Sequence, residues 1–279
     1  MKSHSRDDRA EPVPQAPFGY SRSRGVGVIR CRALSSLPGL GHAFSTRLGD
    51  DGVDFDLGGP DEGRPAADRR RALCAAAGLD GQRPHLLRQV HGDRVLHAGP
   101  AMRGGEEADG LVLLESDRPR RVAAVRTADC VPLLLADAEG RAVAAVHAGW
   151  RGTAAAVVKR AVELLAELGI PRARLIAAMG PAIGPCCYEV GEEVLGAVAE
   201  ATGVRAEVIE APGGVERKLD LRLANRLQLE DAGLAPAAIH AAPHCTACSE
   251  RLFFLHRRGR SGRLMACIGW TRAAPAGPA

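Results

Sequence analysis

The sequence is poor in aromatic residues and lacks any long hydrophobic run. Phe, Trp and Tyr make up 3% of its 279 residues, so a flat aromatic platform for stacking single-stranded nucleic acid is not expected. No segment approaches the roughly 18 consecutive apolar residues of a membrane-spanning helix. The N-terminus has no apolar stretch like that of a secretory signal peptide. We therefore expect a cytoplasmic protein with no nucleic-acid partner and no membrane partner.

Charge of one sign is not in large excess either. The formal net charge is +4, and the arginines are scattered, which argues against a polyanionic partner. Eight cysteines in a chain of this length, without an export signal, are expected to be reduced thiols or metal ligands and not a disulfide framework. The apolar fraction of 46% is ample for a core, which must be built from Ala, Val and Leu. The length allows one large domain or two small ones.

The segment from Thr127 to Thr153 contains the most informative pattern. Residues 133–136 and 141–146 predict two buried strands joined by a tight turn. Such a hairpin would bring Cys130 and His147 together at one edge of a sheet, and His91, in another strand-like segment, offers a third ligand. Two imidazoles and one thiolate suit zinc, with an open fourth position typical of a catalytic site. On these residues alone, core histidines and a buried apolar cysteine remain the alternative.

The order of elements favours a mixed sheet. Strands and helices are interspersed and several strands are connected as hairpins, which argues against a purely parallel sheet. We predict helices over residues 65–79, 152–168, 192–201 and 219–232, and strands over 26–29, 111–114, 121–125, 175–179, 239–242 and 264–270, with two short strands within 86–98. The Gly-x-Gly-x-x-Gly pattern of a dinucleotide site is absent.

Several longer motifs follow one another along the chain. They are Gln89-Val90-His91-Gly92, Thr127-Ala128-Asp129-Cys130-Val131-Pro132, His147-Ala148-Gly149-Trp150-Arg151-Gly152 and Gly180-Pro181-Ala182-Ile183-Gly184-Pro185-Cys186-Cys187-Tyr188-Glu189-Val190-Gly191. Together they resemble the laccase-domain family, also called the multicopper polyphenol oxidase family. The flanking segments His42-Ala43-Phe44-Ser45-Thr46-Arg47 and Phe253-Phe254-Leu255-His256-Arg257-Arg258 agree. The resemblance spans roughly residues 28–270.

The resemblance implies a fold and an activity. The expected fold is α+β, a single domain with layered α/β/β/α architecture and mixed sheets. We place this domain at residues 27–271, after a disordered tail of residues 1–26 and before a C-terminal tail of residues 272–279. Many bacterial members of the family are described as purine nucleoside phosphorylases with adenosine deaminase activity. The resemblance thus implies a zinc enzyme acting on a nucleoside and phosphate, which we expect to be a monomer.

The resemblance also implies roles for individual residues. His91, Cys130 and His147 would be the zinc ligands, so Cys130 and His147 would also serve catalysis. Asp129 is the nearest candidate acid or base, or it orients a ligand. Candidate substrate-binding residues are Arg47, Arg151 and Tyr188. Arg47 could instead pair with a carboxylate. For Arg151, amides at the start of the helix predicted over 152–168 would support phosphate binding.

Other interpretations stay open at this point. Copper bound to the same ligands would give a polyphenol oxidase, because two histidines and a cysteine also form blue-copper sites. Alternatively, Cys130 would be the nucleophile of an amidase acting on cell-wall precursors. Cys186 and Cys187 are expected to have a structural or pocket-wall role and not to share one metal, because neighbouring side chains of an extended chain point apart. Cys245 and Cys248 have metal-ligand spacing, but a single such pair is weak evidence.

Overall fold

The structure is a computed structural model that describes residues 17–49, 54–58, 63–99, 102–117, 121–203, 217–257 and 262–271. Its strands are β1 (Phe18–Ser23), β2 (Val26–Cys31), β3 (Leu40–Ser45), β4 (Pro84–His85), β5 (Val95–His97), β6 (Gly110–Leu114), β7 (Val122–Thr127), β8 (Val131–Asp137), β9 (Ala142–Ala148), β10 (Leu175–Met179), β11 (Ile239–Ala241) and β12 (Leu264–Trp270). The α-helices are α1 (Arg32–Ser35), α2 (Gly63–Ala76), α3 (Trp150–Ala154), α4 (Val157–Glu167), α5 (Glu192–Thr202) and α7 (Leu221–Asp231). Short 3-10 turns occupy η1 (Arg172–Arg174) and η2 (Pro236–Ala238).

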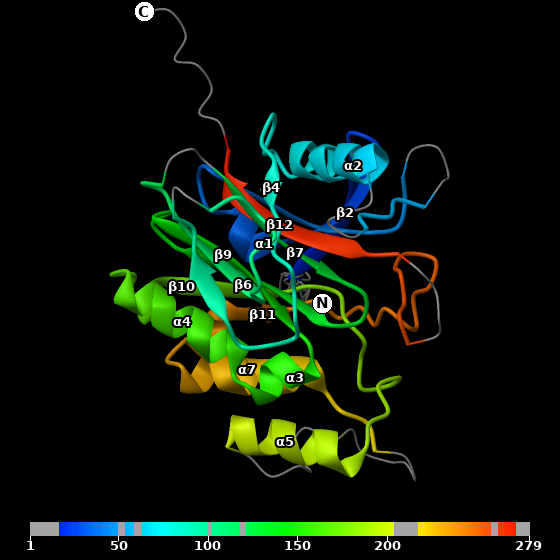
Figure 1. The fold of residues 1–279 in the computed structure, drawn as a ribbon, viewed down its shortest axis with the longest axis vertical. Helices are drawn as coiled ribbons and strands as arrows, with labels where there is room; N and C mark the ends of the chain where they lie inside the picture. Colours follow the sequence, from blue (N-terminus) through cyan, green and yellow to red (C-terminus); the bar gives the residue numbers. More distant parts are fainter. Residues whose placement is uncertain are drawn as a thin grey trace, which may run out of the picture.

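The strands form two stacked sheets, and helices cover both outer faces (Figure 1). The 6-stranded sheets have the orders β1-β2-β3-β12-β7-β4 and β11-β10-β8-β9-β6-β5. Most neighbouring strands are antiparallel, whereas β4 with β7, β5 with β6 and β10 with β11 are parallel. Helix α2 lies on the first sheet, α4 and α7 lie on the second, and α5 lies beyond them. This arrangement confirms the predicted single-domain α/β/β/α sandwich with mixed sheets.

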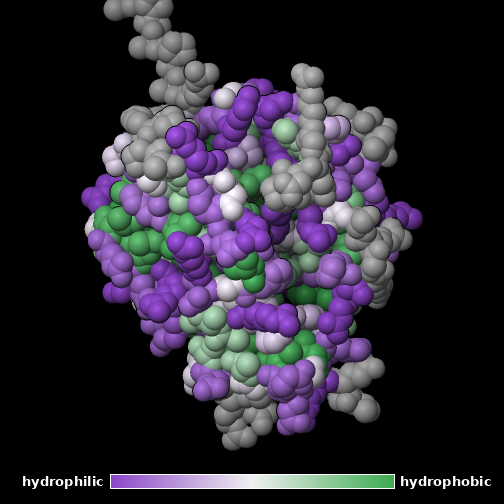
Figure 2. Space-filling view, viewed as in Figure 1, coloured by the Kyte–Doolittle hydropathy of each residue, from purple (hydrophilic) through white to green (hydrophobic). Residues whose placement is uncertain are grey.

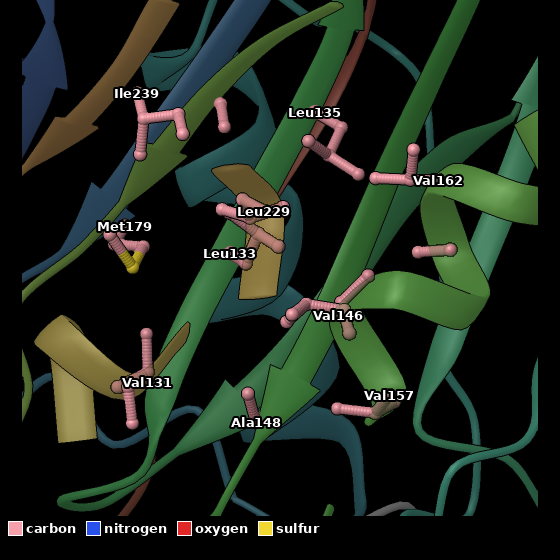
Figure 3. Packing of buried hydrophobic residues seen from close by; sticks show 14 of the residues in the cluster. Val131, Leu133, Leu135, Val146, Ala148, Val157, Val162, Met179, Leu229 and Ile239 are labelled. Atoms are coloured by element: carbon pink, nitrogen blue, oxygen red, sulfur yellow. The ribbon is translucent and has the colours of Figure 1, made fainter. Parts of the chain in front are cut away.

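Buried side chains fill the space between all four layers. Strand β8 shows how: Leu133 and Leu135 pack against the helices, while Leu134 and Ala136 pack between the two sheets. A strand buried on both faces has a continuous apolar run instead of an alternating one, and the run in β8 is of this kind. Figure 3 shows side chains of β8, β9 and β10 lying beside those of α4 and α7, with Val146 among them.

Most of the predicted elements are confirmed. Strands β6, β7, β10, β11 and β12 and helices α2, α5 and α7 lie within a few residues of the predicted ranges. Asp220 caps α7, because its carboxylate accepts the backbone N–H groups of Arg222 at 3.1 Å and Leu223 at 3.0 Å. Within residues 86–98, however, the structure has one strand, β5, and not the predicted two.

The single helix predicted over residues 152–168 is wrong. Helix α3 ends at Ala154 and α4 begins at Val157, and Ala156 between them has a left-handed φ of 62°, which residues other than glycine rarely adopt. Gln228 of α7 donates to the Thr153 carbonyl at 2.7 Å, so the neighbouring helix satisfies a backbone group at the break. Helix α3 spans only 5 residues, and the expected anion site at its N-terminus stays a prediction.

The ordered chain begins earlier than predicted. Strand β1 pairs antiparallel with β2, from Phe18 opposite Cys31 to Ser23 opposite Val26. Its turn has positive φ at Arg24 and Gly25, as a two-residue hairpin requires. The prediction of disorder is therefore wrong for residues 17–26. This segment has little apolar periodicity, but its backbone N–H and C=O groups are paired in the hairpin. Residues 1–16 and the predicted tail 272–279 lie outside the described residues.

Truncation separates the two parts of this N-terminal segment. Deleting residues 1–16 is expected to leave the melting temperature nearly unchanged, since that segment is polar. Deleting residues 1–25 removes β1 and exposes the apolar surface around Phe18, whose ring centroid lies 6.0 Å from that of Phe44. Losing one buried aromatic side chain costs about 1.5–3 kcal/mol, and roughly 2–4 °C is lost per kcal/mol at this chain length. Thermal denaturation of the two truncations tests this, and equal melting temperatures would contradict it.

Polar side chains cover most of the face drawn in Figure 2, with smaller apolar areas between them. Of the large hydrophobic side chains in the described ranges, only Tyr20 and Val90 are exposed. None of the helices that the structure describes is long and apolar enough to cross a membrane.

Candidate metal centre

The centre lies where the β8–β9 hairpin ends. Pro132 pairs with His147, and Val131 pairs with Ala148. Cys130, which directly precedes β8, is therefore beside the last residues of β9, and the predicted hairpin is confirmed. The register is strongly specified, because a slip of one residue would turn every side chain of a strand to the opposite face of the sheet.

His91 reaches the same edge from the loop between β4 and β5. The sequence predicted a strand there, but His91 has a left-handed φ of 60° and lies in a bend. The buried carboxylate of Asp109 maintains this bend. It accepts the backbone N–H groups of Val90 at 3.2 Å, His91 at 3.0 Å and Gly92 at 2.8 Å. Three hydrogen bonds to one carboxylate offset the cost of the left-handed conformation.

Asp109 also orients the second histidine. It directly precedes β6, which pairs with β9 so that Gly110 lies opposite Val146. The His147 backbone N–H donates to the Asp109 carbonyl at 2.7 Å, and His147 Nδ1 lies 2.8 Å from Asp109 Oδ1. Because Nδ1 contacts the carboxylate, Nε2 is left for the centre. A histidine held by a carboxylate in this way is typical of metal ligands.

Three potential ligand atoms converge at the centre. One atom each from His91, Cys130 and His147 lies within 4.8 Å of the others, and the two imidazole centroids are 4.7 Å apart. Gly149 keeps the space beside them clear, because a Cβ there would lie 3.0 Å from Cys130 Sγ and 3.1 Å from His91 Cδ2. His147 is buried, Cys130 half-buried and His91 exposed. Two imidazoles and a thiolate, open on one side, fit zinc with a free fourth position.

The groups at the centre alter one another's protonation. Burial by itself raises the pKa of the Cys130 thiol, but hydrogen bonds with His147 and His91 outweigh burial and lower the pKa to about 6. Burial lowers the pKa of His147, but its hydrogen bonds with Asp109 and Cys130 outweigh that effect and raise the pKa to about 9. Since a thiolate is the form that binds metal, these surroundings favour the ligand form of Cys130 at neutral pH.

Two pockets open onto the centre. The first has a volume of about 240 Å³, and its wall includes Trp150, Ile183 and Tyr188. The second has a volume of about 340 Å³, and its wall includes Arg126 and Arg263. Both pockets are lined by the shared residues His91, Ala128, Cys130 and His256. The candidate ligands therefore lie between two compartments, and arginines line both: Arg151 and Arg257 the first, and Arg126 and Arg263 the second.

Two of the predicted substrate-binding residues line the first pocket. Arg151 is exposed, and its guanidinium lies 4.3 Å from the ring centroid of Trp150. Tyr188 is half-buried, with the guanidinium of Arg257 5.5 Å from its ring centroid. Burial raises the pKa of Tyr188 to about 12, so the phenol keeps its proton at neutral pH. Contact of Arg151 and Tyr188 with a substrate stays a prediction.

Arg47, the third predicted substrate-binding residue, lines neither of these pockets. Its Nε donates to Asp54 Oδ1 at 2.8 Å, and its Nη1 donates to the Glu250 carbonyl at 2.9 Å. It borders a separate depression formed with residues 247–252. This placement favours the alternative interpretation, an arginine paired with a carboxylate, and a substrate role for Arg47 stays a prediction.

Asp129 lies in the wall of the first pocket, next to Cys130 in sequence. Its Oδ1 accepts the Thr246 hydroxyl at 2.7 Å, and its Oδ2 accepts the backbone N–H groups of His256 and Arg257, both at 2.9 Å. These contacts tie the loop that follows β11 to the centre. They favour a positioning role for Asp129, and its role as acid or base stays a prediction.

The most important residue that sequence reasoning missed is Asp109. It lies two residues before the strand predicted over residues 111–114. Its partner His147 is 38 residues away in sequence, so no local pattern connects the two. The available signal is an acidic residue directly beside the apolar run of β6. This signal by itself does not show whether the residue lies in an exposed turn or is the buried partner of a histidine.

The fold and the centre define this protein as an α/β/β/α sandwich with a candidate His–Cys–His metal site. The chain belongs to the multi-copper polyphenol oxidoreductase laccase family, whose sequence model matches residues 42–271.

Two relatives and one solved structure are similar to most of the chain. The chain is 40% identical to "Purine nucleoside phosphorylase" of Deinococcus radiodurans over 239 residues, which cover 83% of this chain and 89% of that protein. It is 36% identical to "Adenosine deaminase RL5" of an unknown prokaryotic organism over 231 residues, 77% of this chain and 88% of that protein. The crystal structure of Bacillus licheniformis hypothetical protein YfiH superposes with a TM-score of 0.77 and 26% identity, covering 90% of this chain and 98% of that one.

Proposed function

We propose that this protein is a zinc-dependent purine nucleoside phosphorylase that also deaminates adenosine. The observation that carries the proposal is the convergence of His91, Cys130 and His147 at the junction of two pockets. The names of the two relatives, one a phosphorylase and one a deaminase, support this pair of activities. The substrates would be a purine nucleoside and inorganic phosphate, and the reaction would take place in the cytoplasm.

The two pockets suit different parts of the reactants. The first offers the aromatic rings of Trp150 and Tyr188 and the apolar side chain of Ile183, which fit the faces of a purine base. The second is lined by Arg126, whose Nη1 and Nη2 donate to the carbonyls of Gly58 and Leu87, and by Arg263. The positive charges of these two residues fit the oxygens of phosphate. A nucleoside with its base in the first pocket would place its ribose at the junction, next to the phosphate.

The chain's residues would position the reactants and the metal. A zinc ion bound by the three ligands supplies a Lewis acid with an open fourth position. Asp109 holds the imidazole of His147 and the bend at His91 in place. In phosphorolysis, a phosphate oxygen forms a bond to the anomeric carbon while the base leaves with the bonding electron pair and takes up a proton. In deamination, water replaces the purine amino group and ammonia leaves.

The proposal is tested by incubating the purified zinc-loaded protein with inosine, with and without phosphate. We expect hypoxanthine and ribose 1-phosphate to form only when phosphate is present, because phosphate is the nucleophile. Adenosine should yield inosine without phosphate, because deamination uses water. Chromatography of the products measures both reactions on one preparation, and a sulfate buffer of equal ionic strength is the control.

The alternative functions predict different outcomes. A polyphenol oxidase would turn over phenols only with added copper and oxygen, and phosphate would have no effect. An amidase would cleave a muramyl–amino acid bond and be blocked by alkylation of Cys130. If zinc-loaded protein leaves inosine and adenosine unchanged in phosphate buffer, the proposed function is wrong.

A further inference from the structure

Four cysteines outside the centre come together from two distant parts of the chain. Cys186 and Cys187 lie in the loop after β10, and Cys245 and Cys248 lie in the loop after β11. Because β10 and β11 are parallel neighbours, both loops leave the sheet at the same edge. A further parallel bridge between Ala182 and Cys245 keeps the two loops side by side.

The four sulfur atoms have the spacing of a single metal site. All of them lie within 4.8 Å of one another, and Cys248 Sγ is 3.4 Å from that of Cys186 and 3.5 Å from that of Cys187. A tetrahedral zinc ion with Zn–S bonds of about 2.3 Å places its sulfurs about 3.8 Å apart. A cluster of several iron atoms would hold its thiolates further apart than one ion does.

The local backbone explains how two adjacent cysteines can face one point. The prediction that Cys186 and Cys187 do not share one metal rests on an extended chain, in which neighbouring side chains point apart. Here Cys186 and Cys187 lie in a turn closed by the Cys187 N–H, which donates to the Gly184 carbonyl at 3.0 Å. Cys245 and Cys248 lie in a second turn, closed by the Ser249 N–H, which donates to the Cys245 carbonyl at 3.1 Å. Each turn gathers its two thiols on one side.

Two polar groups beside the sulfur atoms would stabilise the negative charge of a metal–thiolate group. The backbone N–H of Gly184 donates to Cys245 Sγ at 3.2 Å. A Cβ at position 184 would lie 3.3 Å from both Cys186 Sγ and the Arg222 guanidinium, so this positive charge is close to the sulfurs. Four thiolates around a divalent ion carry a net charge of −2, which an adjacent arginine partly offsets.

We infer that Cys186, Cys187, Cys245 and Cys248 bind a second, structural zinc ion. Four protein ligands leave no open position, which is the arrangement of structural and not catalytic sites. The ion would join two loops that both form the wall of the first pocket. One loop carries Ile183 and Tyr188, and the other carries His256 and Arg257. The second site would thus hold the substrate pocket in shape without taking part in the reaction.

Zinc content and thiol protection test the inference independently of any activity. We expect the wild-type protein, purified with reductant, to contain about two zinc ions per chain, and Cys186→Ser/Cys248→Ser and Cys130→Ser to contain about one each. Both replaced cysteines of the double variant are exposed, so it should fold. Cys31→Ala, which alters a cysteine outside both groups, is the matched control and should keep about two zinc ions.

In the wild type, the four cysteines should react with an alkylating reagent only after a chelator is added, as peptide mass spectrometry would show.

Cobalt substitution gives a second readout. Thiolate-to-cobalt charge-transfer absorption should fall by more than half in the double variant, because it removes two of the four thiolates and the tetrahedral site. The inference would be overturned if the wild type contained about one zinc ion, and if Cys130→Ser lost this ion while the double variant retained it. A disulfide between Cys248 and Cys186 or Cys187 in the reduced preparation would also overturn it. Two bound zinc ions without inosine cleavage would contradict the proposed function but support this second site.

Discussion

His147→Ala is expected to abolish inosine phosphorolysis and adenosine deamination together. The substitution removes one of three candidate ligands, and it leaves the Asp109 carboxylate buried without its imidazole partner. Zinc content should fall by about one ion per chain. Elemental analysis and the two product assays, performed on the same preparation, measure the result.

A second histidine provides a matched control. His97→Ala removes an imidazole that also contacts a carboxylate, with its Nε2 3.1 Å from Asp117 Oδ2, but His97 lines neither pocket of the centre. This variant should keep its zinc and both activities. If His147→Ala retained one activity while losing the metal, the two reactions would not share a centre, and the proposed function would need to be divided.

Asp109→Asn is expected to weaken zinc binding or activity by about 10–100-fold without removing any ligand. The carboxylate accepts three backbone N–H groups and contacts His147 Nδ1. An amide has one oxygen and one NH₂ group. The NH₂ group cannot accept a hydrogen bond, so it would replace an acceptor of the backbone N–H groups with a second donor. Each buried donor left unpaired costs about 1–3 kcal/mol. The bend that holds His91 should therefore loosen, and the melting temperature should fall.

Zinc affinity, measured by competition with a chelator, distinguishes positioning from a purely structural role. Asp117→Asn is the matched control, because Asp117 Oδ2 also accepts a backbone N–H, that of Leu114 at 2.8 Å, and contacts a histidine. It should lower stability without changing zinc affinity. If both variants lost stability equally and bound zinc as tightly as the wild type, Asp109 would have no special role at the centre.

The strands near the centre were predictable because their signal is local. Residues 133–136 and 141–146 form two apolar runs around a turn, and a hairpin necessarily brings its ends together. The layered fold was predictable through the family resemblance, which rests on several long motifs. The break at Ala156 was not predictable in the same way, since residues 152–168 have continuous helical periodicity. Contacts from α7 across the fold decide that break.

The residues that complete the candidate site depend on pairing between segments distant in sequence. Asp109 faces His147 because β6 lies beside β9, and Arg126 and Arg263 border one pocket because β7 lies beside β12. The sequence by itself determined the mixed sheets, the hairpin and the chemical types of the three candidate ligands, because periodicity and side-chain chemistry are local properties. Only the tertiary structure decided the bend at His91, the placement of Arg47 away from the centre and the grouping of four cysteines, because strand pairing sets which distant loops meet.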